Sequence, residues 1–557
     1  MTPDRPSPLN TRHRPGWPLI GLLGAGIVLV VIAFWVVADP LGDSDSSVNA
    51  QYTEAIVGVP SRINPLFVHL SDADRDIASL VFSGLVKLGK DGSPQPDLAE
   101  SWDVSEDGKT VTFRLRSGVT WHSGAEFSSS DVLFTYALLA SPELQADPEQ
   151  SALWSSVKCA APDALTVSCA LPEPFAPFLV YASIGILPKY LLESTTPATI
   201  AEDPFNRSPI GTGPFRLTRL ESDSAILRAN DNYYLGRPFF DEINLRFYPD
   251  IESAAADLVR GEVQGLMVDL SINPTDFQAL GTLDGLDEYV SNRSAYTSLF
   301  LNNTTPPLNE PAVRRAVALA VDKNSMISGL LGGRGVPVDS PVPPGSWAFN
   351  DDLKAPEHDI GEARNVLDEA GWKESEGGAR TNGSTELRLT LLTDEDPLRG
   401  AVAEMIAEQL QDIGIETTVS QETSSDLVRD FLTPRNYQAA VFGWDPGPDP
   451  DPYPAWHSSQ AQEAGRNIAG YASDTADEYM ENGRQSFDSS ERADLYRQFQ
   501  SLFLGDAASV PLYSHLYTYF VSAEIKNVDP GLLFWPSSRF RNVSEWEFTA
   551  ASQEIGG

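Results

Sequence analysis

The chain has 557 residues and is 41% hydrophobic. That is enough for buried cores and is more length than one core usually organises, so two or three domains are expected. Aspartate and glutamate number 78 against 39 lysines and arginines, which gives a formal net charge of −39. A chain so anionic repels phosphate backbones, which argues against nucleic acid as a partner. The charge indicates a solvated surface, with an acidic cleft for cationic ligands as the alternative.

The N-terminal segment predicts the cellular location of the protein and its orientation in the membrane. Residues 19–38 form an uncharged apolar run, which at a helical rise of about 1.5 Å per residue spans a bilayer core of roughly 30 Å. Three arginines precede this run and three aspartates follow it, so we expect a cytoplasmic stub at 1–18 and the rest of the chain outside. Residues 39–49 would form a polar linker. The alternative to a retained transmembrane helix is a signal peptide cleaved after Ala38.

Apolar spacing along the body predicts a mixture of helices and strands. A strand at 386–393, a helix at 398–414 and a strand at 415–421 form one unit, which implies parallel strands joined by a crossover. Further on, a helix at 489–507 leads into a strand at 509–522. The mixture indicates an α/β protein with more than one lobe.

The two cysteines lie close together in the sequence. Cys159 and Cys169 flank a turn-forming "APDA" and sit in alternating segments, which predicts a β-hairpin. Facing cysteines on paired strands come close enough to bond, and export would favour that bond. A disulfide is therefore expected outside the cytoplasm, with two buried free thiols as the alternative.

Sequence motifs for catalysis and cofactor binding are incomplete. Gly108–Thr110 ends like a phosphate-binding loop, but Asp103 occupies the position of the required glycine. Gly211–Phe215 lacks the third glycine of a dinucleotide fingerprint, and the six histidines show no metal-ligand spacing. We therefore predict no cofactor, no metal and no catalytic residue. A pair of catalytic carboxylates of the glycoside hydrolase type stays an open alternative, because the two residues need to be close in space but not in sequence.

Six stretches, taken in chain order, resemble bacterial solute-binding protein family 5, the receptors of peptide- and nickel-type ABC importers. Together they are spread over nearly the whole body after residue 50. The stretches are 98–136, 209–217, 230–243, 299–327, 363–372 and 443–459.

The resemblance implies a two-lobed α/β fold of the periplasmic-binding-protein type (class II) with an extra inserted domain, preceded here by the transmembrane helix. Two chain crossings, near Leu299–Asn303 and Ser514–Tyr519, would connect the lobes and act as the hinge. The expected divisions are lobe I at 50–86, 206–302 and 515–550, the inserted domain at 87–205, and lobe II at 303–514.

The resemblance also places a ligand at the loop "GWDPGPDPDPYPAWHSS". Peptide-binding members use an aspartate there to pair with the peptide amino terminus, but Gly447 stands where that aspartate is expected. The loop candidates are Trp444, Asp445, Asp449, Asp451 and Tyr453. Weaker candidates elsewhere are Arg62, Asn64, Tyr296, Asn302 and Asn467. The alternative is that the aspartates cap turns and the tryptophan packs in the core.

The predicted function is an extracytoplasmic receptor of an ABC importer, anchored in the membrane and located in the periplasm or at the cell surface. It would capture an oligopeptide or similar polar solute by closure of two lobes and work as a monomer with the ABC permease subunits. Covalent chemistry is not expected. The alternatives are a sensory or scaffold protein of the same fold and an extracellular hydrolase.

Overall fold

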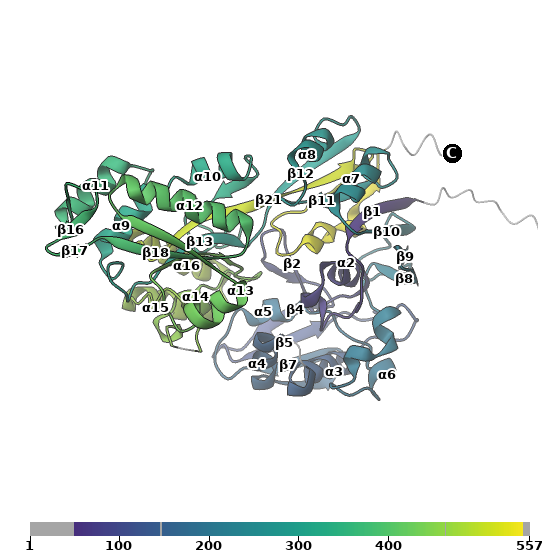
Figure 1. The fold of residues 1–557 in the computed structure, drawn as a ribbon. Coiled ribbons are helices and arrows are strands. Elements are labelled where there is room, and N and C mark those ends of the chain that lie inside the picture. The colour runs from purple at the N-terminus through teal and green to yellow at the C-terminus, as the bar shows by residue number, and fades with distance from the viewer. Residues whose placement is uncertain (1–49, 145–146, 463, 550–557) are drawn as a thin grey trace, which may run out of the picture. The chain divides into compact units, whose positions relative to one another are not determined.

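A mixed β-sheet of twelve strands forms the frame of the protein in the computed structural model, which describes residues 50–144, 147–462 and 464–549 (Figure 1). In spatial order, ten of its strands are β19 (Glu416–Glu422), β18 (Arg388–Asp394), β20 (Ala439–Trp444), β13 (Tyr296–Leu301), β21 (Val510–Ser522), β11 (Gly265–Val268), β1 (Gln51–Val57), β10 (Glu242–Tyr248), β9 (Ser224–Ala229) and β8 (Phe215–Leu220). The other two, β12 (Leu286–Asn292) and β14 (Gly335–Pro337), pair with β21. We call the half from β11 to β8 the first lobe and the half from β19 to β13 the second lobe.

Strand β21 joins the two lobes. Its first residues pair with β13, with Thr297 opposite Tyr513, and its later residues pair with β11, with Val268 opposite Thr518. The passage between these pairings matches the expected crossing at 514–519. The other crossing lies at 293–295, between β12 and β13, and not at 299–303, because residues 299–301 already belong to the fully buried strand β13 of the second lobe.

The second lobe is built around the predicted strand–helix–strand unit. Strand β18 pairs in parallel with β19 and with β20, and helix α12 (Pro397–Asp412) makes the crossover. Successive residues of β13 point to opposite faces of the sheet. Leu299 therefore packs with α9 (Pro311–Ala320), α10 (Lys323–Leu330), α11 (Ile360–Glu369) and α12. Phe300 packs on the other face with α15 (Asp474–Gln485) and α16 (Ser489–Gly505).

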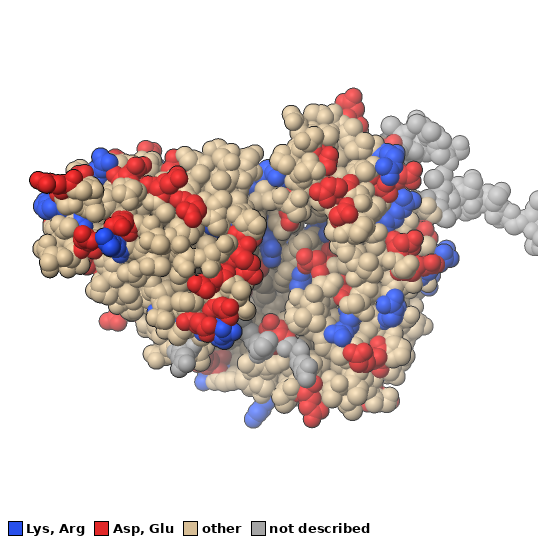
Figure 2. All heavy atoms as spheres, in the orientation of Figure 1, with Lys and Arg blue, Asp and Glu red and all other residues tan. Residues whose placement is uncertain are grey.

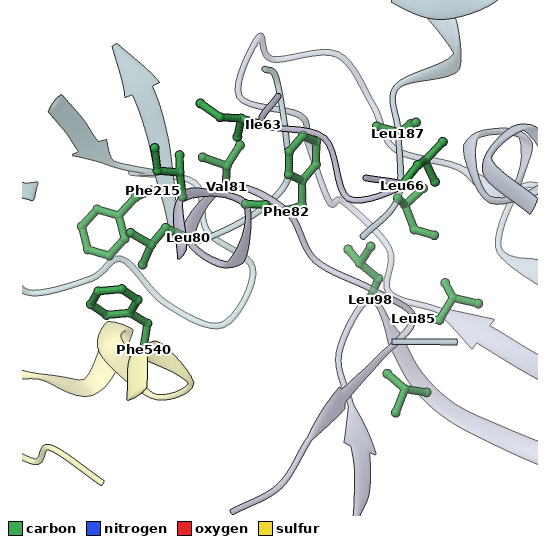
Figure 3. Packing of buried hydrophobic residues seen from close by; sticks show 14 of the residues in the cluster. Ile63, Leu66, Leu80, Val81, Phe82, Leu85, Leu98, Leu187, Phe215 and Phe540 are labelled. Carbon is green, nitrogen blue, oxygen red and sulfur yellow. The ribbon is translucent and has the colours of Figure 1, made fainter. Parts of the chain in front are cut away.

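The first lobe uses the same alternation along β1. Tyr52 and Ile56 enter the largest hydrophobic cluster, while Ala55 packs with α7 (Ile251–Val259). Helix α2 (Asp72–Val81) is capped by the Ser71 side chain and ends where the chain turns to extended backbone. Figure 3 shows the residues at this end, Leu80 to Phe82, among the side chains of that cluster.

A separate four-stranded sheet packs onto the first lobe. Its strands, in spatial order, are β4 (Ala99–Val104), β5 (Thr110–Leu115), β7 (Thr166–Ala170) and β6 (Lys158–Asp163). Cys159 on β6 lies opposite Cys169 on β7, and the two form a disulfide. Helix α3 (Ser129–Leu139) packs against this sheet, and its core residues belong to the first lobe's largest cluster.

The remaining elements are short. The strands are β2 (Val86–Leu88), β3 (Pro94–Pro96), β15 (Lys373–Glu374), β16 (Arg380–Asn382), β17 (Thr385–Glu386), β22 (Ile525–Lys526) and β23 (Glu547–Phe548). The α-helices are α4 (Pro148–Ser156), α5 (Phe178–Tyr181), α6 (Lys189–Leu192), α8 (Pro274–Leu280), α13 (Ser424–Asp426) and α14 (Tyr453–Trp456). The 3-10 and π turns are η1 (Val68–Leu70), η2 (Pro142–Leu144), η3 (Ile200–Glu202), η4 (Pro204–Arg207), η5 (Leu427–Leu432), η6 (Ser458–Gln460), η7 (Pro536–Phe540) and η8 (Val543–Glu545).

Membrane insertion was predicted only for the N-terminal segment. None of the helices within residues 50–549 that the structure describes combines the length and apolar character needed to cross a bilayer. The predicted stub at 1–18, transmembrane helix at 19–38 and linker at 39–49 lie outside the described residues.

Candidate functional site

A cavity of about 430 Å³ lies between the loop that follows β20 and the end of α2. Figure 2 shows that the surface between the lobes is hollowed, with side chains of both charges along the hollow. The first lobe lines the cavity with Pro65, Leu66, Val68, His69, Arg75, Ala78, Ser79, Phe82, Gly84, Trp535 and Ser537. The segment around the four-stranded sheet adds Asp147, Gln150, Phe175, Pro177, Val180, Tyr181, Ser183, Ile184 and Gly185. The second lobe adds Pro446, Pro448, Asp449, Asp451, Pro454 and Arg484.

The loop at 445–454 owes its shape to alternating prolines. Every second residue from 446 to 454 is a proline, and proline has no N–H for a strand ladder or helix. Three aspartate side chains accept backbone N–H groups two residues further on instead, which is the turn geometry that aspartate favours. These bonds run from Gly447 to Asp445 (2.9 Å), from Asp451 to Asp449 (3.0 Å) and from Tyr453 to Asp451 (3.1 Å).

Each of the three loop aspartates also faces an arginine of the protein. The pairs are Asp445 with Arg293 (3.2 Å), Asp449 with Arg492 (2.6 Å) and Asp451 with Arg484 (2.8 Å). The resemblance left open that a ligand ammonium group pairs with one of these carboxylates, and in the structure each of the three carboxylates already pairs with a guanidinium. Direct contact of these aspartates with a ligand stays a prediction.

The Asp449 pair is the most buried of the three. Both guanidinium Nη atoms of Arg492 donate to the carboxylate, at 2.6 and 3.0 Å. Burial raises the pKa of Asp449, and the positive charge of Arg492 offsets part of that rise. The doubled hydrogen bond fixes this part of the cavity wall.

The two predicted aromatic residues of the loop contact other protein groups. Trp444 is half-buried, with its ring 6.1 Å from that of Phe300 and 5.1 Å from the Arg466 guanidinium. It lines a smaller cavity of about 110 Å³ that shares Asp451 with the larger one. Tyr453 stacks on His457, with 4.1 Å between the ring centres. Trp444 therefore packs against the protein with part of its ring, as the packing alternative expected, and lines the smaller cavity with another part.

The three predicted asparagines are fully buried and bond to the protein itself. The Asn64 amide donates to the Asn206 side chain at 2.9 Å. Asn302 donates to two carbonyls, one of them that of Tyr437 at 2.8 Å. Asn467 donates to three carbonyls, the shortest of these bonds being 2.8 Å. These bonds give each asparagine a structural task, and ligand contact by them stays a prediction.

The last two predicted residues differ in exposure. Arg62 lies partly exposed over the Phe67 ring and reaches Glu202 at 3.4 Å. Tyr296 is buried on β13 opposite Trp444, and burial raises its pKa. Within the described residues its hydroxyl has no hydrogen-bond partner.

Sequence reasoning missed the side of the cavity formed by α2. Arg75, Ala78, Ser79 and Phe82 all line the cavity, and their spacing of three or four residues places them along one side of the helix. That periodicity was a usable signal for Arg75. Trp535 gave no such signal, because it reaches the cavity from a distant part of the chain.

Comparison with known proteins gives consistent matches. A model of the family described as bacterial extracellular solute-binding proteins, family 5 Middle, matches residues 93–465. The oligopeptide-binding protein AppA of Bacillus subtilis is 29% identical over 500 residues, covering 88% of this chain and 90% of AppA. The dipeptide-binding protein of Escherichia coli is 30% identical over 523 residues, covering 87% and 93%.

Solved structures agree with these matches. AppA from Bacillus subtilis in complex with a nonapeptide has a TM-score of 0.65 and 27% identity, covering 90% of this chain and 99% of AppA. NikZ from Campylobacter jejuni in complex with Ni(L-His) has a TM-score of 0.68 and 25% identity, with the same coverage. The fold is thus the two-lobed α/β fold of periplasmic binding proteins, and the chain belongs to the bacterial extracellular solute-binding proteins of family 5.

Proposed function

We propose that this protein is an extracytoplasmic receptor that captures an oligopeptide or similar polar solute and delivers it unchanged to the membrane subunits of an ABC importer. The observation that carries the proposal is the cavity of about 430 Å³ walled by residues of both lobes. Its volume falls in the range of pockets that enclose small organic ligands. The peptide-binding names of the relatives support a peptide as the solute.

Capture would work by closing the two lobes on the solute. The lobes are joined by few strands, since β21 is shared and the other passage is at 293–295. A solute that contacts both walls stabilises the closed arrangement by its preference for that state. The importer would then recognise a closed receptor, which works as a monomer and breaks no covalent bond.

The N-terminal segment and the domain divisions belong to the same proposal. Residues 19–38 would anchor the receptor in the membrane, with 1–18 inside, 39–49 as the linker and the body outside. Of the expected divisions, 87–205 would be the inserted domain and 303–514 part of lobe II, while lobe I would comprise 50–86, 206 to the crossing at 293–295, and 515–550; the boundary expected at 302 is wrong, because β13 belongs to the second lobe. Fractionation of cells that express the full chain tests the anchor. Recovery in carbonate-washed membranes with an uncut N-terminus supports it, and release of a chain that begins after Ala38 contradicts it.

Thermal unfolding with a peptide panel tests the function. A ligand that binds the folded state raises the free energy of unfolding by about 2.7 kcal/mol at one hundred times its Kd. The full chain, purified in detergent, should melt at a higher temperature in the presence of some di- to pentapeptides. Its melting temperature should not change with sugars of matched size. Mass spectrometry of the recovered solute is the control, because a cleaved product would favour the hydrolase alternative instead.

A further inference from the structure

The charges and apolar groups that line the cavity indicate which chemical class of solute it binds. This inference rests on the proposed function. We propose that the cavity selects a solute with an apolar body and one carboxylate, that Arg75 binds this carboxylate, and that no free amino terminus is required. An amino-blocked hydrophobic dipeptide is the simplest solute of this class.

The acidic groups of the lining are already neutralised. Asp449 and Asp451 each hold an arginine, at 2.6 and 2.8 Å, and Arg484 itself lines the cavity. Asp147 interacts with the neighbouring His69 and is not a free carboxylate either. An ammonium group that enters the cavity would therefore meet ion pairs, where each carboxylate's attraction is balanced by a nearby positive charge.

The Arg75 guanidinium has bonding capacity left for an anion. Its side chain is 16% exposed, and its Nη1 atom donates to Asp72 at 2.7 Å. That is the one hydrogen bond made by this guanidinium in the described part of the chain. A guanidinium has five N–H donors in a fixed planar arrangement, so Arg75 retains donors for a carboxylate.

The surroundings of Arg75 favour an added negative charge. Asp72, its partner, is 59% exposed, so water screens much of that charge. Burial lowers the pKa of Arg75 even though Asp72, Asp76 and Asp445 all act to raise it, so these acidic groups compensate the charge of Arg75 incompletely. The Trp535 ring lies 5.2 Å from the guanidinium and holds it at the cavity wall.

The rest of the lining is largely apolar. Both lobes contribute such side chains, and Figure 3 shows Leu66 and Phe82 within the hydrophobic cluster behind the wall. Val180, Tyr181 and the loop prolines at 446, 448 and 454 face the same space. Burial of apolar solute groups against such walls is favourable, at roughly 25 cal/mol per Å².

Calorimetric titration of the full chain with three matched ligands tests the proposal. The ligands are Leu-Phe, N-acetyl-Leu-Phe and N-acetyl-Leu-Phe amide. Acetylation should change the Kd by less than about threefold, whereas amidation should weaken binding about tenfold or more, the size expected for a lost charged hydrogen bond. Arg75→Gln should weaken the binding of N-acetyl-Leu-Phe by the same factor and leave the Kd of the amide unchanged.

Arg260→Gln is the matched control, because Arg260 is also a first-lobe arginine that pairs with an aspartate three residues before it, but it does not line the cavity. It should bind all three ligands like the unmodified chain. A tenfold loss on acetylation, or no loss on amidation, would contradict the inference and leave the receptor function intact. Failure of all three ligands to bind would contradict the inference alone, whereas the receptor function would be contradicted only if the whole peptide panel also failed to bind.

Discussion

Individual ion pairs in the loop at 445–454 differ mainly in burial. The side chains of Asp449 and Arg492 are 9% and 7% exposed, whereas those of Asp445 and Arg293 are 42% and 34% exposed. Removal of one partner from a buried pair leaves a charge without solvent or counterion. The same removal at the surface lets water take the partner's place. Two aspartates of one loop should therefore contribute very differently to stability.

We expect Asp449→Asn to lower the free energy of unfolding by about 3–5 kcal/mol. Asp445→Asn, the matched control, should lower it by less than about 1 kcal/mol. Urea unfolding of both variants measures the difference. Equal losses would show that burial does not set the strength of these pairs.

Trp444 is predicted to contribute more to binding than to folding. The ring is half-buried and has one aromatic partner, so Trp444→Ala should lower the free energy of unfolding by roughly 1 kcal/mol. Calorimetry should show weaker peptide binding. Phe442→Ala is the control, because Phe442 packs with the same cluster two residues earlier on β20 and does not line either cavity next to the loop. If the Trp444 variant does not fold, the ring contributes mainly to the stability of the core and the prediction is wrong.

Sequence alone could locate the loop but not its ion pairs. Its resemblance to the family predicted that it faces a cleft, and it lines the cavity between the lobes; its aspartates cap turns as the alternative interpretation held. The arginine partners could not be predicted, because Arg484 and Arg492 lie 33 and 43 residues from the aspartates they hold. Such distant pairs depend on how α15 and α16 pack, which no local pattern encodes.

Among single elements, local patterns were informative where one face alone is buried. The helix expected at 398–414 is α12, at 397–412, and the hairpin around the cysteines is β6 and β7. Three adjacent serines stand at the start of helix α3, and its cap is Ser128, whose side chain joins Asp131 in a reciprocal cap. Several adjacent serines can each cap a helix, so only the reciprocal partner distinguishes them.

The β6–β7 hairpin should depend on its disulfide. The cysteines are 10 residues apart. Closing a loop of this size reduces the conformational entropy of the unfolded chain, which raises the free energy of unfolding by about 2–3 kcal/mol. Dithiothreitol should therefore lower the melting temperature of the folded chain. The double variant Cys159→Ala, Cys169→Ala should melt at the lower temperature with or without reductant. A melting temperature that does not respond to reductant would show that the four-stranded sheet is stable without the bond.

For the whole molecule, two buried groups should shape stability with opposite pH dependence. Burial raises the pKa of Asp97 from 3.8 to about 6, against the hydrogen bond it accepts from Tyr234. The folded state then holds a proton that the unfolded chain has lost, so stability falls by about 2 kcal/mol as pH rises from 4 to 6. Burial lowers the pKa of His122 from 6.5 to about 4. There the unfolded chain binds the extra proton, so stability rises with pH over the same range.

Single substitutions should separate these contributions. Asp97→Asn should make the free energy of unfolding rise with pH between 4 and 6, relative to the unmodified chain. His122→Gln should make it fall. Urea unfolding at pH 4, 5, 6 and 7 measures both slopes. Parallel curves for the three proteins would mean that neither group has a shifted pKa.

The shared strand β21 has a consequence for biogenesis. It begins at Val510 and lies in the middle of the twelve-stranded sheet, where it pairs with β13 of one lobe and β11 of the other. Neither lobe can therefore complete its hydrogen-bonded ladder before ribosomal synthesis has passed β21, although most of the strands of both lobes precede it in the chain. Contacts between segments so far apart in sequence form slowly, so the final step of folding should couple the two lobes.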